Sequence, residues 1–102
     1  LSFGQKKLLD LGTVLMADPD LILLDEPAAG INLRLLEDII NKLVTLKNQG
    51  KTILLIEHNM DLVMGISDEV IVMSAGIIIA QGKPSEIQKN AKVLEAYLGS
   101  KA

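Results

Sequence analysis

Runs of consecutive aliphatic residues predict two buried strands in this chain. They occupy positions 21–24 and 52–56. A short run that is apolar at every position is typical of a strand buried on both faces of a parallel sheet. Residues 33–49, which lie between the two runs, instead carry apolar residues at intervals of three and four, and Gly50 follows them. That spacing predicts an amphipathic helix that ends where a glycine is expected.

Two further helices are predicted beside these strands. The first begins at Ser2, whose hydroxyl can cap a helix, and extends to about Ala17, just before an Asp-Pro step. The other follows the second strand, over residues 59–65. Helices that alternate with strands predict an α/β fold with a parallel sheet.

The last part of the chain predicts a hairpin and short helices. Residues 69–73 and 77–81 are strand-like and flank a Ser-Ala-Gly turn, which is typical of an antiparallel pair. Pro84 begins a short helical turn, and residues 91–98 form a closing amphipathic helix. We therefore expect one compact α/β unit in which parallel strands are accompanied by a small antiparallel edge hairpin.

Composition narrows the classes of function. The chain has 102 residues, of which 49% are apolar, with one Phe, one Tyr and no Trp. Its core is therefore aliphatic, and it lacks the aromatic residues that stack on nucleic-acid bases. The net charge of −3 argues against binding to a phosphate backbone, and the absence of cysteine excludes disulfides and thiolate metal sites. The longest uncharged stretch, residues 70–82, is shorter than the roughly 20 residues of a membrane-spanning helix.

Two adjacent carboxylates are the first candidates for chemistry. Asp25 and Glu26 follow the first predicted strand directly, and open α/β sheets bind their ligands at the carboxyl ends of strands. One carboxylate of such a pair can hold a hydrated Mg²⁺ while the other orients or deprotonates a water molecule. The alternative is that both acids are simply the polar end of a strand.

A phosphate contact is possible at two other places. Ser2 and Gly4 lie at a predicted helix N-terminus, which offers a hydroxyl, free N–H groups and the positive end of the helix dipole. A plain helix cap is the simpler interpretation of these residues. His58, the single histidine, follows the second strand, where a neutral imidazole could reach a terminal phosphate. The alternative is a structural histidine that caps the next helix.

Two short segments imitate a phosphate-binding loop without its spacing. Residues 50–52 and 82–84 resemble the end of the G-x-x-x-x-G-K-[ST] motif, but Thr45 and Ile77 stand where its first glycine is required. The chain therefore contains no Walker A loop. Lys6 and Lys7 are predicted to lie on a solvated helix face.

In this order and spacing, the segments resemble the C-terminal half of an ABC-type ATPase, a P-loop NTPase of RecA-like α/β fold. Residues 1–5, here called the signature segment, read Leu-Ser-Phe-Gly-Gln and are similar to the family signature Leu-Ser-Gly-Gly-Gln. Residues 21–26 resemble the Walker B strand, and residues 28–32 occupy the D-loop position, with Asn32 where many members have Asp. His58 matches the switch histidine.

A narrower resemblance is to the ATPase subunits of branched-chain amino-acid importers. Residues 25–30, residues 56–64 and the C-terminal Tyr-Leu-Gly carry it. Urea and amide importers share much of this pattern, and lipopolysaccharide exporters share the closing Tyr-Leu-Gly. The resemblance spans residues 1–102 as a partial ABC ATPase domain, from the signature to a C-terminal extension, without the Walker A half.

The resemblance implies that ATP and Mg²⁺ are bound and that one ATP lies between two ATPase subunits, identical or different. Asp25 would hold Mg²⁺ through water, Glu26 would polarise the attacking water, and His58 would sense the γ-phosphate. The residues that would serve the nucleotide of the other subunit, or the interface with it, are Ser2, Phe3, Gly4, Gln5 and Asn32.

The same resemblance implies transmembrane permease subunits and, indirectly, a solute-binding protein as partners. It implies no nucleic acid, and a peripheral location at the cytoplasmic face of the cell membrane. Without a Walker A loop, we expect the chain alone to bind ATP weakly and not to hydrolyse it. The alternatives are a short, non-enzymatic module that pairs with a complete ATPase, and an ABC ATPase of translation or DNA repair. The acidic charge balance and the importer-like tail argue against the latter.

Overall fold

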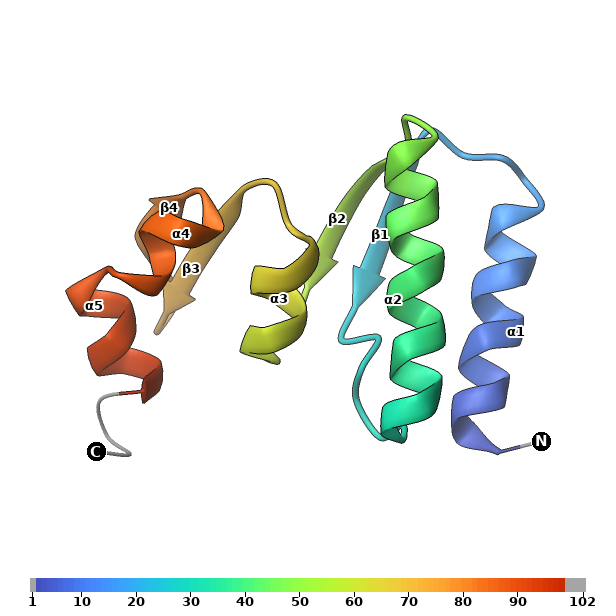
Figure 1. The fold of residues 1–102 in the computed structure, drawn as a ribbon, viewed down its shortest axis with the longest axis horizontal. Helices are drawn as coiled ribbons and strands as arrows, with labels where there is room; N and C mark the ends of the chain where they lie inside the picture. The colour runs from blue at the N-terminus through green and yellow to red at the C-terminus, as the bar shows by residue number, and fades with distance from the viewer. Residues whose placement is uncertain (1, 99–102) are drawn as a thin grey trace. The chain divides into compact units, whose positions relative to one another are not determined.

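The computed structural model describes residues 2–98, and its helices and strands alternate as far as residue 74 (Figure 1). They form two compact units, Leu1–Asn59 and Met60–Ala102, each considered by itself below. The sequence led us to expect one compact unit, whereas the contacts within the structure divide into these two. Each unit has its own two-stranded sheet: a parallel pair in the first and an antiparallel pair in the second. The predicted α/β class, with parallel strands and an antiparallel hairpin, is confirmed.

The first unit is built on two parallel strands. Strands β1 and β2 pair in register, from Leu21 opposite Thr52 to Asp25 opposite Ile56. Because the strands run the same way and end at the same level, the residues that follow them emerge side by side. The elements of this unit, in chain order, are α1 (Phe3–Leu15), β1 (Leu21–Asp25), α2 (Leu33–Asn48) and β2 (Thr52–Ile56).

Side-chain caps fix where the two long helices begin. The Ser2 hydroxyl accepts the N–H of Gln5, and the Gln5 side-chain oxygen accepts the N–H of Ser2, which together form a capping box. Helix α1 ends at Leu15, two residues before the predicted Ala17. Helix α2 begins after Asn32, whose side chain accepts the N–H of Leu35.

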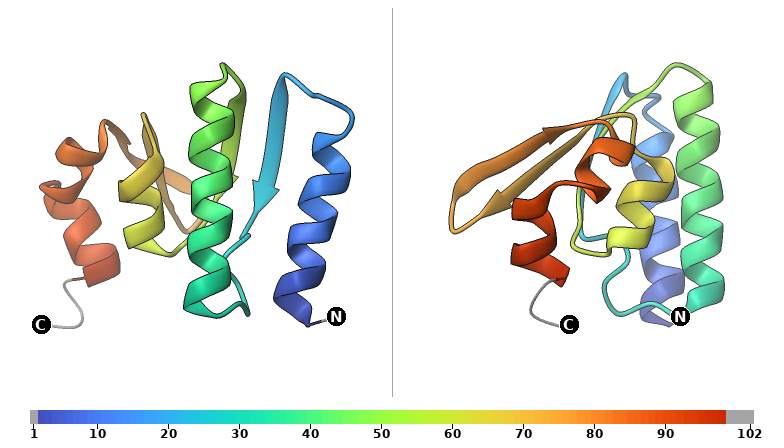
Figure 2. Two further views of the ribbon diagram at one scale, coloured as in Figure 1. Left: turned by 45° about the vertical axis from the view of Figure 1, so that its right-hand side comes forward. Right: turned by 60° about the vertical axis from the view of Figure 1, so that its left-hand side comes forward.

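Helices α1 and α2 cover one face of the parallel pair (Figure 2). Ile22 of β1 is fully buried, as are Ile39 and Leu43 of α2. The side chains that alternate onto the other face are more than half exposed, namely Leu21, Leu23, Leu54 and Ile56. Burial of both faces, predicted from the unbroken apolar runs, is therefore wrong for the described residues, since this unit places no element over the second face.

The second unit is a hairpin with short helices. Its turn residues Ala75 and Gly76 both have positive φ, 51° and 78°, as in the two-residue turns that match strand twist. Val70 and Val72 of the hairpin, Ile87 and Val93 form its buried core. The elements are α3 (Met60–Ile66), β3 (Val70–Ser74), β4 (Ile77–Gly82), α4 (Pro84–Gln88), α5 (Ala91–Val93) and the π-helical turn η1 (Leu94–Leu98).

The predicted hairpin is confirmed with small shifts of its ends, and the closing helix predicted over residues 91–98 is divided into the short α5 and the π-helical turn η1. The hydroxyl of Tyr97, in the π-helical turn, donates a hydrogen bond to the carbonyl of Met73 in β3. The end of the chain that the structure describes is therefore attached to the hairpin. Between residues 2 and 98, no helix combines the length and apolar character needed to cross a bilayer.

Candidate functional site

Two residues predicted to carry chemistry meet at the carboxyl ends of the parallel strands. Glu26 directly follows β1, and its N–H donates to the carbonyl of Ile56 at 2.7 Å, so the pairing with β2 continues one step past the strand. His58 lies just beyond the end of β2, and its Nδ1 is 2.7 Å from Oε1 of Glu26. The prediction that both side chains lie at one edge of the sheet is confirmed.

The Glu26 carboxylate and the His58 ring are both open to solvent, with side-chain exposures of 46% and 73%. Glu26 has a φ of 49°, so its backbone leaves the extended conformation at this residue. In a continuing strand, residues 25 and 26 would point to opposite faces. At Glu26 the backbone is left-handed, so the strand does not continue in this way. The Glu26 carboxylate contacts His58, which follows the neighbouring strand β2.

The distance between His58 Nδ1 and Glu26 Oε1 is that of a close polar contact. A carboxylate oxygen only accepts hydrogen bonds, so Nδ1 would have to carry a proton to donate one to it. In a neutral ring of that tautomer Nε2 would be an acceptor, and it would be a donor only in the imidazolium form.

Glu57, between β2 and His58, was not predicted as a site residue. Its Oε2 accepts the N–H of Ala28 at 3.1 Å, from the loop after β1. Its Oε1 accepts the N–H groups of His58 at 3.1 Å and Asn59 at 3.3 Å. One carboxylate thus joins the chain after β1 to the chain after β2. The position of Glu57 after an apolar strand, like that of Asp25 and Glu26, was the available sequence signal.

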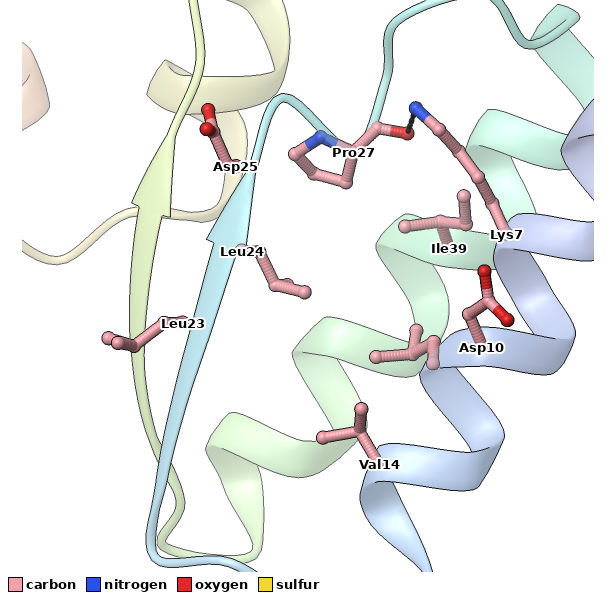
Figure 3. A pocket seen from close by; sticks show the side chains of 9 residues that line it. Lys7, Asp10, Val14, Leu23, Leu24, Asp25, Pro27 and Ile39 are labelled. Carbon is pink, nitrogen blue, oxygen red and sulfur yellow. Dashed lines mark hydrogen bonds between the residues drawn. The ribbon is translucent and has the colours of Figure 1, made fainter.

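Lys7 on α1 reaches the same loop from the other side. Its Nζ donates to the carbonyls of Glu26 at 3.1 Å, Pro27 at 3.2 Å and Ala29 at 2.7 Å. The interaction with Pro27 is drawn in Figure 3. Because an ammonium group has three donors, these bonds use all of them. The predicted solvated face is therefore wrong for Lys7, while Lys6 is exposed as expected.

The signature segment is described from residue 2 onward and packs against the loop after β1. The ring of Phe3 lies beneath the ammonium of Lys7, 5.0 Å from it to the ring centroid. A Cβ on Gly30 would lie 2.9 Å from Cε2 of that ring, so the glycine allows the close approach. Gly4 is buried, and a Cβ there would lie 2.4 Å from Leu35. This glycine therefore serves the packing of α1 on α2.

Asp25 and Asn32 lie apart from these contacts. Asp25 is exposed at the end of β1, on the edge of a pocket of about 210 Å³ between α1, β1 and α2. Figure 3 shows that this pocket is lined mainly by aliphatic side chains, with Lys7, Asp10 and Asp25 as its charged residues. Asn32 is an exposed helix cap.

The positions of the acidic side chains show how a divalent cation such as Mg²⁺ could be bound. Within residues 2–98, no three His, Asp or Glu side chains lie close enough to form a protein cage for a metal ion. Mg²⁺ does not require one, because it keeps several water ligands and commonly uses one or two carboxylates together with phosphate oxygens. The exposed Asp25 carboxylate fits that manner of binding.

The fold matches part of an ATP-binding cassette. A solved structure of an ATP-binding cassette of an ABC transporter, in its ADP conformation, superposes on 97% of this chain with a TM-score of 0.83 and 42% sequence identity. A nucleotide-free ATP-binding cassette gives a TM-score of 0.84 at 41% identity. The chain covers 41% of each of those structures.

Sequence comparison narrows the match to one kind of transporter. Residues 78–102 match the family described as branched-chain amino acid ATP-binding cassette transporter. The probable branched-chain amino acid transport ATP-binding protein LivG of Archaeoglobus fulgidus is 42% identical over 98% of the chain. The high-affinity LivG protein of Salmonella typhimurium is 42% identical over 97%. The chain is thus similar, over nearly all its length, to the C-terminal part of these proteins, and it covers 39% of each of them.

Proposed function

We propose that this chain is the C-terminal part of the ATP-hydrolysing subunit of an ABC importer for branched-chain amino acids. The observation that carries the proposal is the contact of 2.7 Å between His58 Nδ1 and Glu26 Oε1 at the ends of two parallel strands. It is supported by 42% identity to transport proteins of that description. The whole subunit would pair with a second ATPase subunit and with transmembrane permease subunits at the cytoplasmic face of the membrane.

In this proposal Glu26 acts on the water that attacks the γ-phosphate. The carboxylate is half exposed, so a water molecule can reach it, and it can accept that water's proton. The water oxygen bonds to the γ-phosphorus while the bond from that phosphorus to the bridging oxygen breaks, which yields ADP and phosphate. Bound Mg²⁺ would neutralise phosphate charge, and Asp25 would hold it through water. His58 would contact the γ-phosphate through its imidazole ring.

The signature segment would serve the ATP of the other subunit. Ser2 uses its hydroxyl oxygen as the cap acceptor, so its O–H proton is the group that could donate to a phosphate. Gln5 holds that cap in place through its side-chain oxygen. Phe3 and Gly4 would shape the segment, and Asn32 would lie at the dimer interface.

The test is a pair of variants in the complete subunit. We expect Glu26→Gln to abolish steady-state ATP hydrolysis while ATP binding is retained, because the amide cannot take the proton of the attacking water. The matched control is Glu37→Gln, which changes an exposed carboxylate on α2 and should leave turnover unchanged. Normal turnover in Glu26→Gln would refute the assignment.

A second experiment concerns the 102-residue chain by itself. Most of the affinity for nucleotide phosphates comes from the backbone N–H groups and the lysine of a Walker A loop, which this sequence lacks. We therefore expect no hydrolysis and weak binding by the isolated chain. Isothermal titration with Mg-ATP checks this, and micromolar affinity would contradict it.

The transported solute is tested in the reconstituted transporter. With its permease and binding protein present, ATPase activity should rise on addition of leucine, isoleucine or valine and not on addition of urea. Stimulation by urea alone would favour the related urea importers instead.

A further inference from the structure

The backbone of residues 26–30, here called the Glu26 loop, is held from both sides by charged side chains. On one side the Lys7 ammonium donates to the carbonyls of Glu26, Pro27 and Ala29, at distances of 2.7 to 3.2 Å. On the other side the Glu57 carboxylate accepts the N–H of Ala28. A cation thus binds the carbonyls and an anion binds an amide of the same loop.

The two contacts come from different elements of the first unit. Lys7 is on α1, two residues after the signature segment, and Glu57 follows β2 directly. Glu57 also accepts the N–H groups of His58 and Asn59, so it sets the chain that carries the histidine as well as the loop that carries Glu26. Hydrogen bonds to charged groups are roughly twice as strong as neutral ones.

The contacts of Lys7 and Glu57 bear on the backbone conformation of Glu26. That residue has a φ of 49°, which a non-glycine residue keeps only when its surroundings impose it. The Glu26 carbonyl bonded by Lys7 belongs to the peptide that follows this strained residue. Lys7 therefore acts directly beside Glu26, and Glu57 acts two residues further along the same loop, at Ala28.

We propose that Lys7 and Glu57 are positioning residues for the Glu26–His58 pair: they fix the Glu26 loop without touching the reacting atoms. The proposal rests on the proposed function, since it needs Glu26 to act on the attacking water. Lys7 cannot itself bind a phosphate in this geometry, because its three donors are occupied by carbonyls.

The experiment uses the complete subunit and separates kcat from KM. Lys7→Met keeps the length of the side chain and removes the donors, and Glu57→Ala removes the acceptors. We expect kcat to fall about 10- to 100-fold in each, with less than a threefold change in the KM for ATP, because a displacement of about 1 Å at a reacting group costs up to about 100-fold in rate. The matched control is Lys6→Met, the exposed neighbour on α1.

Two further readouts distinguish positioning from general stability. Glu57→Gln, which keeps one acceptor oxygen, should recover part of the rate lost in Glu57→Ala. Amide hydrogen exchange of residues 26–30 should accelerate at least tenfold in Lys7→Met and stay unchanged in Lys6→Met.

The outcomes separate the two proposals. If Glu26→Gln is inactive while Lys7→Met and Glu57→Ala keep kcat within twofold of Lys6→Met, the positioning proposal is overturned and the proposed function stands. A normal rate in Glu26→Gln overturns the function itself. If Lys7→Met or Glu57→Ala does not fold, Lys7→Gln carries the comparison, and wild-type kcat with wild-type exchange in Lys7→Gln overturns the positioning proposal.

Discussion

Gly30→Ala is a sharp test of how the signature segment packs against the Glu26 loop. Gly30 has a φ of 72°, and a left-handed conformation costs an alanine about 1–2 kcal/mol. The added methyl would also lie 2.9 Å from Cε2 of Phe3, which real carbon atoms do not tolerate. Because the Phe3 side chain is 59% exposed, we expect the ring to swing into solvent.

The displaced ring leaves the ammonium of Lys7, and a cation–π contact at an exposed site contributes about 0.5–1 kcal/mol. Replacing a glycine also restricts the unfolded chain, which returns about 0.4–1 kcal/mol of stability. Together these effects predict that Gly30→Ala lowers the free energy of unfolding by about 1–2 kcal/mol. Equilibrium urea unfolding of the complete subunit, followed by circular dichroism, measures the difference.

Gly50→Ala is the matched control, because Gly50 has a φ of 89° and no atom lies within 4 Å of the place that a Cβ would occupy there. It isolates the backbone cost, so Gly30→Ala should exceed it by the Phe3 contribution of about 0.5–1 kcal/mol. In a Phe3→Ala background that excess should vanish. Equal losses in Gly30→Ala and Gly50→Ala, with Phe3 present, would refute the reasoning.

Two other contacts make predictions of their own. The hydrogen bond and charge of Lys51 lower the pKa of Asp18. Their stabilising effect is therefore present above the ordinary pKa of an aspartate and is lost as the pH falls through the lower, folded-state pKa. In Lys51→Gln, an NMR titration should find the pKa of Asp18 back at its ordinary value, and an unchanged pKa would contradict this. Tyr97→Phe removes the bond to the Met73 carbonyl and should cost about 1 kcal/mol in urea unfolding, whereas no loss would show that the contact is not stabilising.

Local patterns were sufficient to predict most of the secondary structure. The apolar runs at 21–24 and 52–56 became β1 and β2, and Ser2 caps α1 as its hydroxyl predicts. The meeting of Glu26 and His58 also followed from sequence, since parallel strands end at a common edge. The prediction that both faces of these strands are buried was wrong. An apolar run indicates that a strand favours burial, but it does not indicate which segment covers each face.

The roles of Lys7 and Glu57 could not be predicted in the same way. Both side chains bind backbone carbonyls and amides, which every residue carries, so no pattern of residue types marks the partners. A lysine on a helix surface is most often solvated. Lys7 is an exception because the turn at residues 26–30 presents three carbonyl groups to its ammonium. Tertiary structure alone brings those carbonyls within reach of α1.

The left-handed backbone at Glu26 costs the fold some stability, and on the proposed function it carries a reacting carboxylate. A φ of 49° costs a glutamate about 1–2 kcal/mol, which a glycine would recover, less about 0.5–1 kcal/mol for its freer unfolded chain. The exposed ion pair with His58 contributes at most about 1 kcal/mol in the other direction. The fold would thus accept glycine at position 26 almost without cost. On the proposed function, a search for thermostable variants of the complete subunit would therefore admit inactive ones there, and only selection for activity would keep the carboxylate.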